Sequence, residues 1–120
     1  MADNRDFTED LMNVLMATDE FSPDLKFSVS MTPKMQAESI DTFILSPRAT
    51  NALHRANIHT AGQLIDNFGT ISKIRNLGIK SVKETKTSLM NWYYDSLDDN
   101  GVEEFWNDFV KMNNISFRRN

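Results

Sequence analysis

The apolar residues of this chain recur every three or four positions along most of its length, which is the spacing of a helix that buries one face. No segment alternates apolar and polar residues for long enough to predict a regular strand, and only residues 27–29 suggest a short extended piece. We therefore predict an all-α protein. Its 120 residues allow one modest domain.

The most clearly marked helix start lies near the middle of the chain. Ser46 can cap a helix whose first residue is Pro47, because proline lacks only an N–H that would be unpaired there. This helix is expected to bury one stripe of side chains and to expose another. The buried stripe is Ala49, Ala52, Leu53 and Ala56, and the exposed stripe is Arg48, Asn51 and Arg55.

Two later helices are predicted from capping-box spacings. Thr60 with Gln63 predicts one start, and Ser81 with Glu84 predicts another. The second of these helices is expected to run to about Leu97.

Other elements are shorter. Thr8 can cap a brief N-terminal helix, while residues 21–36 read as an irregular connection. Gly69 is expected to stop one helix and Thr70 to cap a very short one. After a break at residues 98–101, a last amphipathic helix is predicted. Its aromatic residues, expected to pack onto the bundle, are Phe105, Trp106 and Phe109.

The sequence IRNLGIKS, residues 74–81, joins two of these helices and has the pattern of a helix-hairpin-helix. Gly78 is expected to need either a positive φ or a close backbone approach. The following helix start favours an anion, and Lys80 and Ser81 add a charge and a hydroxyl donor. The sequence thus predicts a contact with a nucleic-acid phosphate. The alternative is a plain turn that buries Leu77 and Ile79.

Together these patterns predict a compact four-to-five-helix bundle with helix-hairpin-helix elements, extended by helices at both termini. We expect an acidic segment with a short helix at 1–36, a DNA-binding domain at 37–97, and an amphipathic helix and tail at 98–120. The net charge of −4 divides unevenly: residues 1–36 carry −4, residues 37–91 carry +3 and residues 92–120 carry −3. Such asymmetry is typical of a polyanion-binding part between parts with another role.

Several function classes are disfavoured. Cysteine is absent, which excludes disulfides and the usual zinc ligands, and His54 and His59 alone do not predict a metal site. No arrangement typical of catalysis is visible, so neither enzymatic activity nor a cofactor is expected. The acidic N-terminus is no signal peptide and no run is long enough to span a membrane, so we expect a cytoplasmic location without membrane partners.

Several short motifs follow one another within residues 40–89. They are Leu45-Ser46 with Arg48, Asn51-Ala52-Leu53, Ala56-Asn57-Ile58, Thr60 with Leu64, and Ile74-Arg75-Asn76-Leu77-Gly78 with Lys80-Ser81 and Glu84. In residue type, order and spacing these motifs resemble the C-terminal domain of the bacterial RNA polymerase alpha subunit. The resemblance covers under half of the sequence, which lacks room for the large assembly domain of a full alpha subunit. A stand-alone relative is therefore expected.

The resemblance implies a compact helical domain that binds the minor groove of A·T-rich promoter DNA and contacts RNA polymerase, sigma factor or a transcription regulator. Arg48 would enter the groove, with Asn51 and Ala52 at contact positions on the same helix. Gly78, Lys80 and Ser81 would hold the DNA backbone, and Glu84 would support this surface by orienting its neighbours.

These observations leave three hypotheses. The first is a non-enzymatic double-stranded DNA-binding protein in transcription control. The second is a protein-interaction module that binds RNA polymerase or a regulator with weak or no DNA binding. The third is a hairpin protein of the DNA-repair type, which would prefer nicked or branched DNA without A·T preference.

Overall fold

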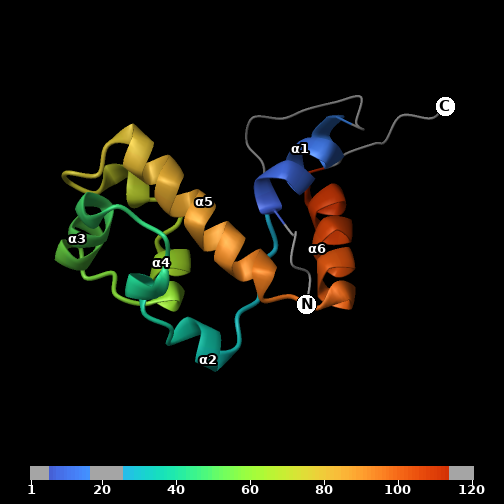
Figure 1. Cartoon of the computed structure of the whole chain (residues 1–120), viewed down its shortest axis with the longest axis horizontal. Helices are drawn as coiled ribbons and strands as arrows, with labels where there is room; N and C mark the ends of the chain where they lie inside the picture. The colour runs from blue at the N-terminus through green and yellow to red at the C-terminus, as the bar shows by residue number, and fades with distance from the viewer. Residues whose placement is uncertain (1–5, 17–25, 114–120) are drawn as a thin grey trace. The chain divides into compact units, whose positions relative to one another are not determined.

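The structure, a computed structural model, describes residues 6–16 and 26–113, and these form helices joined by short connections (Figure 1). Within the described residues the only β-type pairing is an isolated antiparallel bridge between Ser39 and Thr60. The prediction of an all-α fold is therefore confirmed. The elements are α1 (Phe7–Met16), α2 (Pro33–Gln36), η1 (Ile40–Thr42), α3 (Pro47–Arg55), α4 (Ala61–Asp66), η2 (Ile71–Lys73), α5 (Ile79–Asp95) and α6 (Asp99–Met112), where η marks a 3-10 helix.

The protein divides into two compact units. The central unit is residues 31–92, and the terminal unit combines the described parts of residues 1–30 and 93–120. The boundary falls inside α5, between Trp92 and Tyr93. The division into 1–36, 37–97 and 98–120 made from composition remains a prediction about function.

The central unit has its own apolar core, to which every one of its longer helices contributes. Aromatic packing adds to this core, since the Phe43 and Trp92 rings lie 5.1 Å apart. This agrees with the core role expected for Trp92. The buried residues are Ile40, Phe43, Ala49, Ala52, Leu53, Ile58, Ala61, Leu64, Ile71, Leu77 and Leu89.

Local chemistry explains where α3 begins and ends. The Ser46 hydroxyl accepts a hydrogen bond from the Ala49 N–H and Pro47 is the first residue, as predicted. The prediction that Ala56 is buried is wrong, because α3 ends at Arg55 and Ala56 is exposed beyond it. Asn57 follows with φ of 64°, a left-handed conformation that asparagine tolerates better than most residues.

The connection before η1 is fastened to the start of α4. The Ala61 N–H donates to the Glu38 carbonyl at 2.8 Å, and the Ile40 N–H donates to the His59 carbonyl at 3.0 Å. The Thr60 cap of α4 is confirmed by its hydrogen bond from the Gln63 N–H. The Gln63 side chain, however, accepts from the His59 N–H, so the predicted capping box is only half formed.

Three expectations in the connecting segments need correction. The helix after Thr60 ends at Asp66, before Gly69, and the hydroxyl of Thr70 does not cap η2. The region 21–36 is not wholly irregular, because Pro33–Gln36 forms α2 with Thr32 as its cap. Residues 21–25 of that region lie outside the described residues.

The terminal unit is built around aromatic rings. Phe7 contacts Phe27, Tyr94, Phe105 and Trp106, with ring centroids 5.5, 5.6, 6.1 and 6.0 Å away. Of the three aromatic residues predicted to pack on the last helix, Phe105 and Phe109 are 3% and 0% exposed and belong to this core, while Trp106 is half-buried.

Both helices near the ends of the sequence begin earlier than expected. Asp6, not Thr8, caps α1, since the Asp6 carboxylate accepts from the Glu9 N–H at 3.1 Å. Asp98 caps α6 by accepting from the Gly101 N–H at 2.7 Å, so residues 99–101 are helical and do not form the predicted break. No helix in the described ranges has both the length and the apolar character needed to cross a membrane.

Candidate nucleic-acid interface

Glu84 of α5 holds the start of α3. Its Oε1 accepts hydrogen bonds from the Ser46 N–H at 3.2 Å and from the Ser46 hydroxyl at 3.0 Å. The same hydroxyl oxygen accepts from the Ala49 N–H, so one serine both caps α3 and joins it to α5. A carboxylate at this position also complements the positive end of the α3 dipole.

A second contact fixes the direction in which the backbone enters α3. The Ser88 hydroxyl donates to the Ile44 carbonyl at 2.7 Å, one helical turn further along α5 than Glu84. Residues 44–46 therefore run along α5 toward its N-terminal end. The start of α3 therefore lies beside the N-terminal half of α5, at Glu84.

The outer face of α3 carries two of the predicted DNA-binding residues. Arg48 and Asn51 are exposed, while Ala49 and Leu53 on the opposite stripe are fully buried. Ala52, a third candidate, is only 2% exposed and belongs to the core. Its burial does not support the expectation that its side chain faces DNA.

The hairpin before α5 differs from the expected geometry. Gly78 does not have a positive φ; the left-handed residue is Asn76, with φ of 69°. A Cβ added at Gly78 would meet no protein atom within 4 Å. The fold therefore does not require glycine for the turn or for internal packing, and the space beside Gly78 is open.

The first turn of α5 presents a polar and apolar mixture to solvent. Lys80 is exposed and Ser81 is half-buried. Of the two residues that a plain turn would bury, Leu77 is 5% exposed but Ile79 is 91% exposed. The Ser81–Glu84 capping box is absent, because α5 already begins at Ile79 and the Glu84 carboxylate accepts from Ser46 instead.

The formal charge of the protein divides sharply between its two units. Residues 31–92 hold eight Lys and Arg and four Asp and Glu, a formal charge of +4. Residues 1–30 and 93–120 hold five and thirteen, a formal charge of −8, and the two values sum to −4. A polyanion would thus be attracted to the unit that carries Arg48 and Lys80.

Three features of the central unit were not predicted. The sequence pattern paired Glu84 with Ser81 in a capping box, whereas the hydrogen-bond partner of Glu84 is Ser46, 38 positions away. The left-handed Asn76 could have been anticipated, since asparagine tolerates positive φ in tight turns. A contact between His54 and His59 was also missed, although no group of three potential metal ligands occurs within the described ranges.

Comparison with known proteins supports the resemblance found in the sequence. Residues 28–91 match the family model described as the C-terminal domain of the bacterial RNA polymerase alpha chain. Three similar proteins are DNA-directed RNA polymerase alpha subunits. The subunit of Malacoplasma penetrans is 53% identical over 58 residues, or 48% of this protein. The subunit of Syntrophomonas wolfei is 49% identical over 57 residues, and that of Symbiobacterium thermophilum is 40% identical over 57 residues, in each case 47% of this protein.

The matched segment covers 18% of each relative, so the similarity concerns one small part of those subunits. The family match, in contrast, spans more than half of this sequence and includes the whole hairpin and the Ser46–Glu84 contact. The helical fold agrees with it. The protein belongs to the family of C-terminal domains of the bacterial RNA polymerase alpha subunit.

Proposed function

We propose that the protein is a non-enzymatic double-stranded DNA-binding protein that acts in transcription control by contacting the minor groove of A·T-rich promoter DNA. Arg48 enters the groove, Asn51 contacts its edge, and Gly78, Lys80 and Ser81 hold the sugar-phosphate backbone. The observation that carries the proposal is the joining of the start of α3 to the second turn of α5 through Ser46 and Glu84.

Electrostatics and geometry support this assignment together. Narrow A·T-rich minor grooves have an enhanced negative potential that favours an inserted arginine. Arg48 is exposed on a helix whose start is held by two hydrogen bonds. The backbone of this helix start would therefore lose little conformational freedom when the protein binds DNA. Glu84 acts as a positioning residue for Arg48 and makes no contact with DNA itself.

Membership of the family supports a role beside RNA polymerase. The similar proteins are named as polymerase alpha subunits, so RNA polymerase, sigma factor or a transcription regulator are the protein partners we propose. The strongly acidic terminal unit favours a second candidate function, a protein-interaction module in which DNA contact is weak or lost.

Fluorescence anisotropy with the full-length protein separates these functions. A labelled A·T-rich duplex should bind more tightly than a G·C-rich duplex of equal length, at both low and moderate salt. Absence of binding to either duplex at low salt would favour the interaction module. Equal binding to both sequences, with preference for nicked or branched DNA, would instead favour the repair-type hairpin protein.

A further inference from the structure

Ile79 is a large apolar side chain that the fold leaves uncovered. It is the first residue of α5 and is 91% exposed. The buried stripe of this helix passes through Thr85 and Leu89, both fully buried, and Val82 packs against the same core. Ile79 lies outside that stripe, so its side chain takes no part in the packing of the central unit.

The backbone on both sides of Ile79 is nevertheless held in place. Leu77, two positions earlier, is buried in the core, and the Gly78 carbonyl accepts from the Val82 N–H at 2.9 Å. Covering Ile79 with a partner would therefore order only its side chain, at little cost in entropy. The space beside Gly78 is open, so a partner can approach Ile79 from that side.

The charges nearest to Ile79 in the sequence are all positive. Lys80 follows it directly, and Lys83 lies one helical turn later on the same side of α5. Residues 67–83 hold four Lys and Arg and no Asp or Glu. All four cations are exposed, and within the part of the chain that the structure describes none is paired with a carboxylate. A polyanion would therefore be attracted to the surface that carries Ile79.

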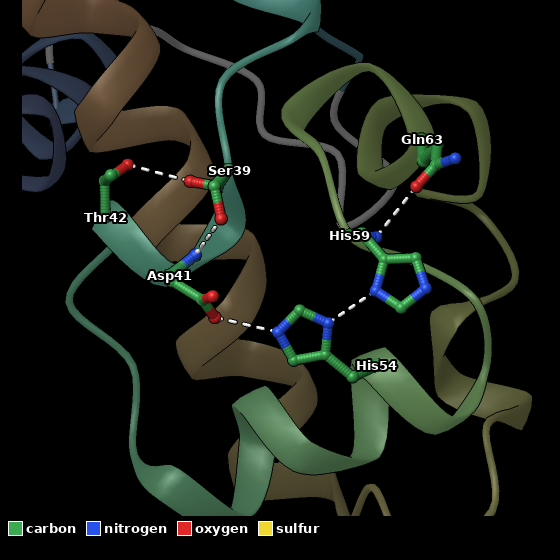
Figure 2. Close-up of polar contacts among 6 residues, drawn as sticks. All are labelled: Ser39, Asp41, Thr42, His54, His59 and Gln63. Carbon is green, nitrogen blue, oxygen red and sulfur yellow. Dashed lines mark hydrogen bonds and ion pairs between the residues drawn. The ribbon is translucent and has the colours of Figure 1, made fainter.

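Exposure alone does not identify a contact residue, since single apolar side chains are common on protein surfaces. Ile44 is 92% exposed, yet residues 35–47 around it hold two acidic residues and no Lys or Arg. One of the two, Asp41, is 62% exposed and lies 2.8 Å from His54 Nε2 (Figure 2). Ile44 and Ile79 thus share residue type and exposure but differ in the charge of their surroundings.

We propose that Ile79 packs against deoxyribose in the minor groove of double-stranded DNA, between phosphates that Lys80 and Lys83 hold. This inference rests on the proposed DNA-binding function and adds a contact residue to it. Along a DNA strand, charged phosphates alternate with sugars whose C–H faces line the minor groove. An apolar side chain between two lysines matches this alternation, and apolar side chains are among those that enter the minor groove.

Methyl NMR of the full-length protein, labelled with ¹³C at the isoleucine δ1 methyl groups, tests the contact directly. The Ile79 signal is the one missing from the Ile79→Val variant. With a saturating A·T-rich duplex, the Ile79 methyl should shift and show nuclear Overhauser contacts to deoxyribose protons, while the Ile44 methyl should be unaffected. Contacts to base protons alone would overturn the sugar assignment and indicate a wedge between base pairs.

The same titration separates this inference from the function on which it rests. Binding of the duplex without any change at the Ile79 methyl would overturn the inference and leave the proposed function intact. Absence of binding to any duplex would overturn both.

Anisotropy titrations measure how much the contact contributes. Ile79→Ser should bind duplex DNA about five- to tenfold more weakly than wild type, because it loses apolar surface that the sugars would cover. The factor should be similar for A·T-rich and G·C-rich duplexes, since sugars carry no sequence information. The salt dependence should stay as in wild type, because no charge is removed. Ile79→Val should lose less affinity than Ile79→Ser.

Ile44→Ser is the matched control and should bind DNA as tightly as wild type. Both serine variants replace exposed side chains, so their urea midpoints should stay close to that of wild type. A loss of affinity at an unchanged midpoint is then a loss of contact and not of fold. Equal affinities of Ile79→Ser and Ile44→Ser would refute the inference.

Discussion

Glu84 accepts both the backbone N–H and the hydroxyl of Ser46, and so connects α5 to the first residue before α3. Each partner has a second role: Ser46 caps α3, while Glu84 lies one turn after Lys80. The two groups proposed to touch DNA, on α3 and at the start of α5, thus share one hydrogen-bonded support. Changes at this support should alter stability and DNA affinity together.

Replacing Glu84 by alanine tests that coupling. The variant leaves the Ser46 N–H without its acceptor in a half-buried position, which should lower the free energy of unfolding by about 1–3 kcal/mol. DNA affinity should fall as well, although a negative charge is removed from a surface that binds a polyanion. Urea unfolding and anisotropy titrations measure the two effects.

Glu104→Ala, on the exposed face of α6, is the matched control and should leave stability nearly unchanged. A gain in affinity for Glu84→Ala would mean that charge outweighs positioning.

A substitution at Gly78 in the hairpin can distinguish an effect on stability from an effect on DNA affinity. Gly78→Ala introduces a methyl group into open space at a residue without positive φ, so the variant should keep the fold. Its thermal midpoint should fall only slightly, because Gly78 precedes the first residue of α5 and alanine is a poorer helix cap than glycine. Its DNA affinity should nevertheless fall if a phosphate approaches the Gly78 backbone closely. Circular dichroism melts and duplex titrations check both statements. An unchanged affinity would remove Gly78 from the proposed contact.

Asn76→Val provides the opposite control in the same turn. A β-branched residue at φ of 69° is strained, and the variant should lose about 1–3 kcal/mol of stability. Asn76→Gly should be tolerated. Equal stability of the valine and glycine variants would contradict the backbone conformation described for this turn.

The helical pattern and the α3 cap could be predicted because they depend on residues close in sequence. Ser46 and Pro47 mark a helix start by themselves, and Asn51 follows from helical spacing. The partner of Glu84 could not be predicted in this way. Ser81 has the right spacing for a capping box, but the tertiary fold brings Ser46 to the same carboxylate. Likewise, one of the two alternatives expected for Gly78 was a positive φ, but the residue with positive φ is Asn76. Both glycine and asparagine tolerate this conformation, so the sequence alone does not determine which of them adopts it.

The division into two units was also beyond local reasoning. The acidic ends looked like separate flanks, whereas they share one aromatic core. In it the Tyr94 hydroxyl donates to Asp10 Oδ2 at 2.6 Å and accepts from Trp106 Nε1 at 2.9 Å. These three residues come from three different helices, so helical periodicity alone does not predict that their side chains meet.

Tyr94→Phe should therefore weaken the terminal unit. The change removes one hydroxyl that serves two partners and leaves the Trp106 N–H and the Asp10 carboxylate without it, at a cost of about 1–3 kcal/mol. Tyr93→Phe is the matched control: its hydroxyl accepts a single hydrogen bond, from the Ser30 N–H at 3.0 Å, and its loss should cost less. Tryptophan fluorescence during urea unfolding reports on both. Equal stability of the two variants would show that the double contact adds nothing.

The −8 charge of the terminal residues should restrain binding of DNA to the +4 central unit through the long-range field. Glu103→Gln combined with Glu104→Gln removes two exposed charges from α6 and should raise affinity for any duplex at low salt. The gain should shrink at moderate salt, since screening shortens the range of the field. Anisotropy titrations at two salt concentrations measure it. Unchanged affinity at low salt would show that these charges do not act on DNA.

Arg48 and Lys80 should differ in how they depend on DNA sequence. An arginine inserted into a narrow groove gains from A·T tracts, while a lysine on a phosphate gains equally from any sequence. Arg48→Ala should therefore weaken binding to an A·T-rich duplex by about 1–3 kcal/mol and binding to a G·C-rich duplex by less.

Lys80→Ala should weaken binding to both duplexes about equally and reduce the salt dependence by about one charge. Titrations of both variants on both duplexes, at two salt concentrations, distinguish the two roles. Arg55→Ala, which removes an exposed charge at the other end of α3, is the control for a general loss of positive charge. If Arg48→Ala weakens both duplexes equally, Arg48 is a phosphate contact. If it weakens neither, the proposed DNA surface lacks its principal residue, and the interaction module becomes the better account of the protein.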